Sequence, residues 1–216
     1  MRIVNYCLTI NRPVIILLIT MSKSDDTKAR IIAATIDLLQ ERGYHATGLN
    51  QIVQESGTPK GSLYFHFPNG KEEIVAEAIH TTQIYVGGMI KQALDSNDKV
   101  GEAIYAVAKG MAQHLKDSDY YKGCAVASIT MDMSGGSNRL QKACDAAFQS
   151  WLMLYENRFI KAGFPQSQAK SWAILSFSIM EGALLVCRAQ RDTEPLDLAA
   201  DLLKNLIDSV CKFSGL

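Results

Sequence analysis

The stretch TGLNQIVQESGTPKGSLYFHFPNGK, residues 47–71, decides how the rest of the chain is interpreted. Its first half has apolar residues at helical spacing, can be capped by Thr47 and ends at Gly57. Thr58 followed by Pro59 combines a capping residue with a first-turn proline, so another helix is expected to start at once. A connection this short makes two helices cross steeply. The stretch therefore predicts two short crossed helices joined by a tight turn.

The second of these helices has two unlike sides. At the angular spacing of an α-helix, Leu63 and Phe67 fall on the side that faces a core. The opposite side carries Lys60, Gly61, Tyr64 and Phe65. Adjacent exposed aromatic residues suggest a binding partner. DNA fits this set, because a lysine reaches guanine or phosphate and a glycine lets the backbone approach the groove closely.

Two alternatives remain open for this helix. Its aromatic residues can be ordinary surface residues of a small three-helix core, without a partner. His66 lies at the edge of the buried side, where a structural histidine and a phosphate contact fit equally well. The preceding segment, Thr27 to Arg42, repeats apolar residues with a helical period, and Gly43 can end it in a left-handed conformation.

The segment from residue 43 to 71 resembles the TetR/AcrR family of bacterial one-component regulators. The positions that carry the resemblance are Gly43, Tyr44, Ala46, Thr47, Gly57, Pro59, Lys60, Gly61, Ser62, Leu63, Tyr64, Phe65, His66, Phe67 and Lys71. The residues that the resemblance implies for DNA contact are Thr47, Lys60, Gly61, Ser62, Tyr64, His66 and Lys71. Phe65 stands where many members have tyrosine, so one hydroxyl-to-phosphate bond is absent there.

Three further features are similar to one branch of the family. Gly70 lengthens the loop before Lys71, and the segments GCAVAS (123–128) and EGALLVCRAQRD (181–192) resemble the LmrA/YxaF branch. Members of that branch repress multidrug-export or small-molecule-responsive genes. The resemblance therefore implies a repressor that is released from DNA by a small hydrophobic ligand.

The charge balance alone would not indicate a DNA-binding protein. The chain of 216 residues holds 22 Lys and Arg against 22 Asp and Glu. Residues 21–80 hold six basic side chains (23, 28, 30, 42, 60, 71) against eight acidic ones (25, 26, 37, 41, 55, 72, 73, 77), which gives a net charge of −2. Because non-specific DNA affinity comes from phosphate neutralisation, we expect that affinity to be weak and its salt dependence shallow.

The N-terminal twenty residues have an unusual composition. Their apolar run from Pro13 is too short to cross a bilayer, and a secretory signal would need a longer core and a better cleavage site. The family-like pattern begins after Met21. We therefore expect Met21 to be the natural start, with residues 1–20 an upstream over-extension; a membrane-tethered regulator is the alternative.

The cysteines and histidines do not predict an enzyme or a metal site. Five scattered cysteines without a C-x-x-C pair are typical of a reducing cytoplasm. The four histidines, His45, His66, His80 and His114, fall on separate predicted elements. No nucleophile, metal-ligand spacing or phosphate loop accompanies them. We expect no cofactor, no metal, no catalytic residue and a cytoplasmic location.

The remainder of the chain is predicted to be helical, without strands or repeats. The expected helices are Lys71–Gly87, Asp98–Asp117, Cys124–Met133, Asn138–Ala162, Gln166–Arg191 and Leu196–Phe213. The expected all-α organisation is an extension (1–22), a helix-turn-helix DNA-binding domain (23–84, with the motif at 47–66) and an effector-binding and dimerisation domain (85–216).

The helix predicted over 166–191 is apolar around most of its circumference. It is therefore either a central core helix or one that packs against a second copy of the chain. Together with 196–213 it can form a two-fold four-helix bundle, through which the resembling family dimerises. A homodimer would place two reading helices about 34–36 Å apart, as a palindromic operator requires.

The candidate effector residues include one carboxylate. Glu181 lies on the apolar helix, seven residues before Arg188, and a buried carboxylate there needs a partner or a ligand. Candidate lining residues are Met89, Met111, Cys124, Met131, Trp151, Tyr155 and Glu181, although each also fits an ordinary core or surface position. A helical architectural or partner-binding protein without an effector is the second functional hypothesis.

Overall fold

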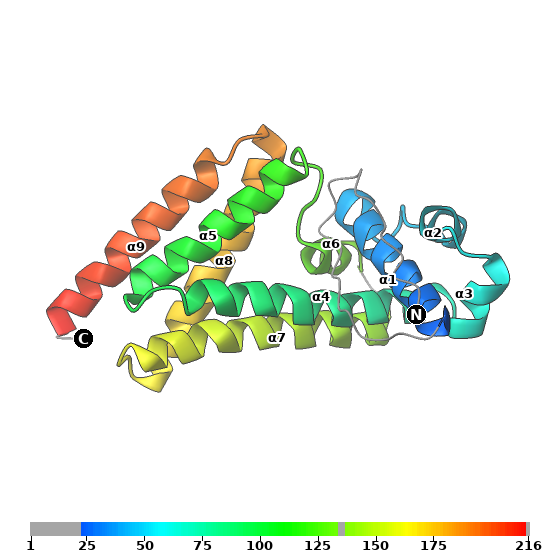
Figure 1. The fold of residues 1–216 in the computed structure, drawn as a ribbon. Helices are drawn as coiled ribbons and strands as arrows, with labels where there is room; N and C mark the ends of the chain where they lie inside the picture. Colours follow the sequence, from blue (N-terminus) through cyan, green and yellow to red (C-terminus); the bar gives the residue numbers. More distant parts are fainter. Residues whose placement is uncertain (1–22, 134–136, 215–216) are drawn as a thin grey trace, which may run out of the picture.

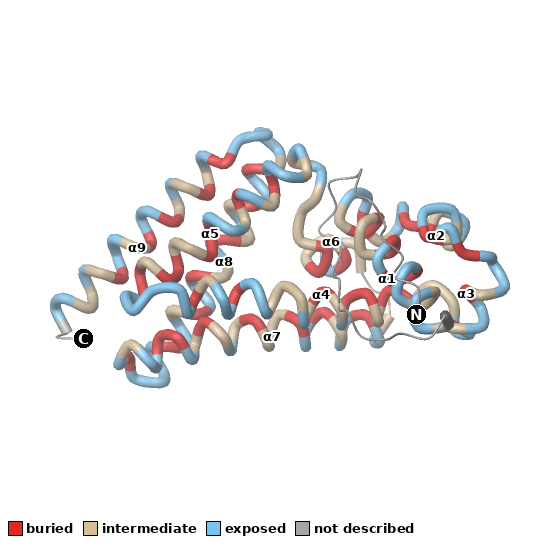
Figure 2. The backbone as a smooth tube through the Cα atoms, in the orientation of Figure 1, coloured by how far each residue is buried: buried red, intermediate tan, exposed pale blue. Residues whose placement is uncertain are grey.

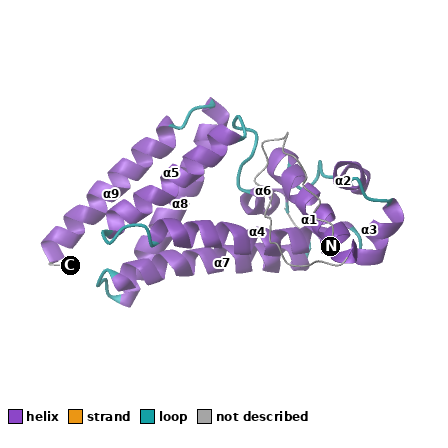
Figure 3. Cartoon of the chain, viewed as in Figure 1, coloured by secondary structure: helices purple, strands orange, loops and turns teal. Residues whose placement is uncertain are grey.

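The computed structural model describes residues 23–133 and 137–214, and within these ranges the chain forms nine α-helices and no strand (Figures 1 and 3). The helices are α1 Lys23–Arg42, α2 Leu49–Ser56, α3 Lys60–His66, α4 Lys71–Leu94, α5 Val100–Asp117, α6 Ala125–Asp132, α7 Asn138–Lys161, α8 Gln166–Gln190 and α9 Glu194–Ser214. The all-α prediction is confirmed. The extension predicted over 1–22 lies outside the described residues.

The helices separate into a small end and a large end. Helices α1–α3 pack together at one end, here called the head, and α4 leads away from it (Figure 1). In the large end, α7 lies along α4 and α8 packs on α7. Helix α8 leads from α7 to α9, and α9 pairs with α5. The head contacts the rest of the molecule mainly through α4 and α6, with further contacts from Arg188 of α8 and from Lys122. Helices α4 and α6 can therefore transmit a change between the two ends.

Helix α4 is longer than the sequence indicated. The Gly87-Gly88 pair was expected to break it, but the helix continues to Leu94. Gly87 faces the Trp151 ring of α7, where a Cβ would be in ordinary van der Waals contact at 3.6 Å. The predicted domain boundary at residue 84 therefore falls inside one continuous helix that belongs to both ends of the molecule.

The core extends through both ends, and part of it lies where α7 packs on α4 and on α8 (Figure 2). The Trp151 indole donates its N–H to the Gln83 carbonyl at 3.0 Å. Arg158 is buried, and its guanidinium donates to the carbonyls of Leu94, Asn97 and Asp98 at 2.6–3.1 Å. These are carbonyls at and beyond the end of α4, which a helix cannot satisfy by itself. These bonds compensate the buried charge of Arg158 and cap the C-terminal end of α4.

Helix α8 buries only one of its sides against the rest of the chain. Its buried residues recur every three or four positions, at Ala169, Ala173, Ser176, Met180, Leu184 and Cys187. The other side leaves Ile174, Leu175, Leu185 and Val186 exposed. Among the described residues, α8 is the one helix that is long and apolar enough to cross a bilayer. Of its most apolar 18-residue window, 28% is buried within the chain. Of the two alternatives for this helix, the central core position is therefore wrong.

Candidate DNA-binding site

The turn between α2 and α3 uses the predicted residues in slightly different roles. Gly57 adopts the left-handed conformation, with φ of +61°, as expected for a residue that ends a helix. Helix α3 begins at Lys60, with Pro59 in the capping position. Thr58 was expected to be the cap, but it is buried and its hydroxyl lies 2.7 Å from that of Ser56. Thr58 therefore stabilises the turn through a buried hydrogen bond.

Thr47 does not have the position that was predicted for it. Its side chain is fully buried, and its hydroxyl donates to the Gly43 carbonyl at 2.7 Å. The cap of α2 is Gly48, whose backbone N–H donates to the side chain of Gln51 at 2.9 Å. Thr47 thus closes the turn between α1 and α2. A side-chain contact from Thr47 to DNA, which the resemblance implied, is contradicted by its burial.

Helix α3 has the two sides that its periodicity predicted. Leu63 and Phe67 are buried in the head. The opposite side exposes Lys60, Gly61, Tyr64 and Phe65, with the two aromatic residues 45% and 78% exposed. Two neighbouring aromatic rings that stay in solvent do not contribute the free energy that burial of apolar surface normally gives a folded chain. This side of α3, here called the reading surface, is therefore available to a partner.

Gly61 supports the same interpretation by what surrounds it. No atom lies within 4 Å of the position that a Cβ would take at this residue. A glycine inside a helix costs about 1 kcal/mol relative to alanine, and nothing in the packing of the chain compensates for that cost here. A glycine with open space in front of it is suited to the close approach of an external surface.

Ser62 and His66 lie at the edge of the reading surface, and both are partly buried. The His66 ring packs edge-on against Phe65, at 5.1 Å between centroids, and lies 6.4 Å from Phe67. This position is compatible with a structural histidine and with a phosphate contact, so both interpretations stay open. Contacts from Ser62 and His66 to DNA stay predictions.

Lys71 is directed into the protein. Its ammonium donates to the Tyr44 carbonyl at 2.6 Å and lies 4.0 Å from the centre of the Tyr44 ring. Burial lowers the pKa of Lys71, although the nearby Asp132 opposes this shift. The ammonium thus ties α4 to the turn after α1, and the contact from Lys71 to DNA stays a prediction.

Sequence reasoning did not predict the contact between that turn and α6. Asp132, the last residue of α6, receives hydrogen bonds from the backbone N–H groups of Tyr44 and His45. These residues are separated by 87 and 88 positions, and no local pattern links them. Only the glycine at position 43 could have indicated a close approach at this turn.

Two candidate effector residues lie together in the interior. Trp151 and Tyr155 of α7 are almost fully buried and surround Phe177 of α8, at 6.2 and 6.0 Å between ring centroids. Burial raises the pKa of Tyr155, and the charge of Glu181 raises it further. Trp151 and Tyr155 therefore form part of the core, and Tyr155 lies near the Glu181 carboxyl.

Glu181 and Cys124 face each other between α8 and the start of α6. Burial raises the pKa of the Glu181 carboxyl to about 7, and a hydrogen bond with Cys124 partly offsets that rise. Burial and the adjacent carboxyl raise the pKa of the Cys124 thiol. Arg188 points elsewhere and donates to the Glu41 carbonyl at 3.1 Å. Among the described residues, no ion pair reaches Glu181.

The methionines do not form one lining. Met111 is partly buried against the core. Met89 and Met131 are 42% and 65% exposed, so neither lies in the core, and their part in a ligand site stays a prediction. Both lie on the outer side of their helices, because the inner positions of α4 and α6 are taken by smaller or branched residues such as Ile90 and Ile129.

The head defines the class of the protein. Helices α2 and α3 are joined by a tight turn, α1 supports them, and the second helix of the pair exposes a lysine, a glycine and two aromatic rings. This is the arrangement of a helix-turn-helix DNA-binding protein, in which the second helix enters the major groove.

Comparisons with known proteins identify the family. Residues 31–78 match the family model of bacterial regulatory proteins of the tetR family. Residues 101–202 match the C-terminal domain of LmrA/YxaF-like transcriptional regulators. The chain is 35% identical over 187 residues to the HTH-type transcriptional regulator YxaF of Bacillus subtilis, covering 87% of this chain and 98% of that protein. It is 33% identical over 183 residues to the regulator LmrA of the same organism, covering 83% and 97%.

Solved structures agree on the fold. A TetR-family regulator from Cytophaga hutchinsonii has a TM-score of 0.76 at 23% identity and covers 88% of this chain and 96% of its own. Reduced NemR from Escherichia coli has a TM-score of 0.72 at 22% identity and covers 83% and 96%. The chain belongs to the TetR family of DNA-binding transcriptional regulators, in its LmrA/YxaF-like branch. Proteins of this family are regulators and not enzymes.

Proposed function

We propose that this protein is a homodimeric, cytoplasmic transcriptional repressor that a small hydrophobic ligand releases from a palindromic operator. The observation that carries the proposal is the reading surface of α3. Leu63 and Phe67 hold the helix on the head, while Lys60, Gly61 and Tyr64 stand free on its other side. In this proposal these residues, with Ser62, Phe65 and His66, contact the duplex.

A dimer is required by the size of the reading helix. Helix α3 has seven residues, too few to read a long sequence alone. The exposed apolar residues of α8 and α9 offer a surface for a second copy of the chain. On α9 they are Leu198, Leu202, Leu206 and Phe213. Two copies joined through α8 and α9 would form a four-helix bundle and present two heads to two half-sites.

An effector site beside Glu181 fits the interior of the large end. Glu181 is half-buried, and burial raises its pKa. A ligand that offers a hydrogen-bond donor would relieve the cost of removing this carboxyl from water. Trp151, Tyr155 and Phe177 supply apolar and aromatic surface next to it. Helix α4 packs on α7 and also begins at the head, so a ligand that displaces α4 would move the heads. A difference of about 1–3 kcal/mol between the two arrangements is enough to shift operator affinity.

The decisive experiment is an electrophoretic mobility shift with the DNA upstream of the gene. Tyr64→Ala should weaken the specific shift at least about tenfold, because one lost DNA contact costs ~1–3 kcal/mol in each head. The dimer measured by analytical ultracentrifugation should stay intact. Tyr121→Ala is the matched control, since Tyr121 is also an exposed tyrosine but lies outside the head.

The effector part is tested in the same assay with a panel of neutral aromatic, cationic and weakly acidic lipophilic compounds. Relief of the shift by one compound supports a ligand-released repressor. A specific shift that no compound relieves would favour the architectural alternative. Loss of the dimer in Tyr64→Ala would mean that this side chain belongs to the fold and not to the DNA contact.

A further inference from the structure

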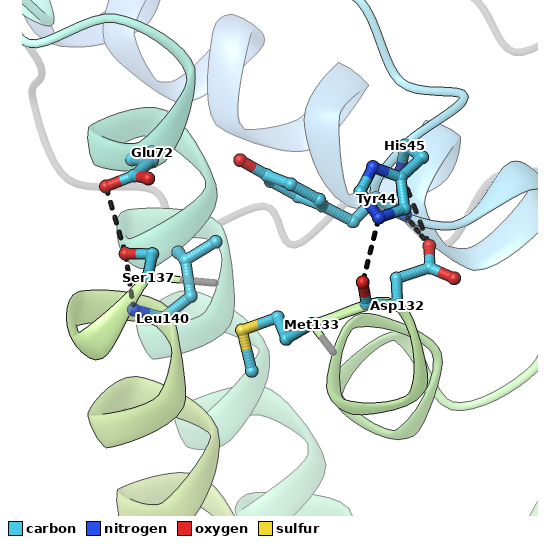
Figure 4. A pocket seen from close by; sticks show the side chains of 7 residues that line it. All are labelled: Tyr44, His45, Glu72, Asp132, Met133, Ser137 and Leu140. Atoms are coloured by element: carbon cyan, nitrogen blue, oxygen red, sulfur yellow. Dashed lines mark hydrogen bonds between the residues drawn. The ribbon is translucent and has the colours of Figure 1, made fainter. Parts of the chain in front are cut away.

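The end of α6 holds the turn that joins α1 to α2 (Figure 4). The Asp132 carboxylate accepts the Tyr44 backbone N–H at 2.7 Å and the His45 backbone N–H at 3.3 Å, both at the same oxygen. The His45 Nε2 lies 2.8 Å from the Asp132 backbone carbonyl. Among the described residues, these three contacts are the hydrogen bonds that link α6 itself to the turn.

The turn is shaped to receive this carboxylate. Gly43 has φ of +77°, and a Cβ at this residue would lie 2.7 Å from the Asp132 Oδ2 and 3.2 Å from the Ser128 Oγ. Glycine is therefore required here for two reasons, the left-handed backbone and the close approach of α6. A side chain at position 43 would displace the Asp132 carboxylate from the turn.

Other contacts fix the same end of α1 without using α6. The Lys71 ammonium of α4 holds the Tyr44 carbonyl, and the Arg188 guanidinium of α8 holds the Glu41 carbonyl at 3.1 Å. Lys122, in the loop before α6, pairs with Asp37 at 2.6 Å. The Arg188 and Lys122 contacts hold α1 itself. Lys71 and Asp132 both hold the turn that leads into α2, Lys71 at the Tyr44 carbonyl and Asp132 at the backbone N–H groups of Tyr44 and His45.

The geometry points to Asp132 as a positioning residue for DNA binding: its carboxylate, acting through Tyr44 and His45, sets the direction in which α2 and α3 leave α1. The inference rests on the DNA contact proposed for α3 but does not depend on any effector. Charge-assisted hydrogen bonds are stronger than neutral ones, so one carboxylate can hold the turn. Beside it, a cavity of about 250 Å³ lined by Glu72, Met133, Ser137 and Leu140 leaves this side of the turn open.

The consequence for DNA is a loss of specificity more than of general affinity. A dimer reads an operator only when both heads fit half-sites at a fixed spacing. Non-specific binding depends on phosphate neutralisation and tolerates a small reorientation of the head. Removing the carboxylate should therefore lower the ratio of specific to non-specific affinity.

The test uses the full chain and a duplex that the unmodified protein selects from random-sequence DNA, with a scrambled duplex of equal length as the non-specific probe. For Asp132→Ala we expect a roughly tenfold drop in specific affinity, because hydrogen bonds to a charged group are lost in each head. Non-specific affinity should change by less than about twofold. Hydrogen exchange at the Tyr44 and His45 amides should become faster. Met131→Ala, at an exposed neighbour on α6, is the control and should change neither quantity.

Asp132→Asn keeps one oxygen acceptor without the charge and serves if the alanine variant fails to fold. Its specific affinity should fall about threefold, since a neutral hydrogen bond has roughly half the strength of a charge-assisted one. An unchanged affinity ratio in both folded variants, or an equal fall on both duplexes, would overturn the positioning role. Failure of the unmodified protein to select any sequence would instead refute the DNA contact of α3, and the positioning role with it.

Discussion

The reading surface of α3 and the outer side of the α8–α9 pair both leave large apolar residues in solvent, but they do so with different chemistry. On α3 the exposed residues are aromatic, and a lysine and a glycine lie among them. On α8 and α9 they are mainly aliphatic, and they recur along helices of 25 and 21 residues. The first surface is small and mixed, whereas the second is long and apolar.

This difference indicates two kinds of partner. An aliphatic surface gains free energy only when it meets another apolar surface, as it does between two copies of one chain. A lysine beside two aromatic rings and an open glycine fits a partner that has both negative charge and a groove. Exposure alone therefore does not identify a partner; the residues that accompany the exposed apolar groups do.

The largest effect is expected from a charge on the α8–α9 side. Leu202 is 72% exposed, and Leu202→Asp would place two carboxylates in a two-fold interface. Like charges brought together cost several kcal/mol, so the dimer dissociation constant should rise at least ~100-fold. Sedimentation velocity measures this change. Ile84→Asp on α4 is the control at a similarly exposed residue; dissociation caused equally by Ile84→Asp would remove the interface from α8 and α9.

A smaller effect is expected at Gly61, where one substitution should raise helix stability and lower operator affinity. Gly61→Ala should raise helix stability by ~0.5–1 kcal/mol, because its Cβ meets no atom of the chain. Operator affinity should nevertheless fall about tenfold, since the added methyl group separates the backbone from the groove. Thermal melts and mobility shifts on the same samples measure both quantities.

The control for Gly61→Ala is Gly110→Ala. Gly110 is an exposed helical glycine on α5 that also has open space around its Cβ position. It should give the stability gain without the loss of affinity. A Gly61→Ala variant that binds its operator as tightly as the unmodified protein would exclude a close approach of DNA to α3.

The features that could be predicted from sequence are local. Periodicity placed Leu63 and Phe67 inside and Tyr64 outside, because a helix of known start leaves little freedom in which side is buried. Glycines at 43 and 57 marked helix ends, since their left-handed backbone is a property of one residue. The turn-and-helix pattern thus predicted the reading surface almost completely.

The errors arose where distant parts of the chain decide a residue's role. Thr47 was expected to cap α2, but its hydroxyl donates to the Gly43 carbonyl. The bond from the Lys71 ammonium to the Tyr44 carbonyl was not expected. Gly87 was expected to break a helix, but α7 packs against it. Asp132 could not be assigned at all, because its partners lie 87 and 88 residues away. Local propensity does not contain such contacts.

The smallest effect is expected in the salt dependence, which separates the two surfaces most directly. Lys60→Ala should reduce the slope of log affinity against log salt by about 1 per subunit, because one phosphate contact is lost. Lys71→Met should leave the slope unchanged, because the ammonium of Lys71 is bonded to the Tyr44 carbonyl. Dimerisation through α8 and α9 should not weaken as salt rises, since aliphatic burial does not depend on charge screening. Fluorescence anisotropy across a salt series measures the DNA slope, and sedimentation measures the dimer. If Lys71→Met reduces the slope as much as Lys60→Ala does, Lys71 contacts the DNA. If the dimer dissociates as salt rises, its interface must contain charged contacts, which the exposed leucines of α8 and α9 do not provide.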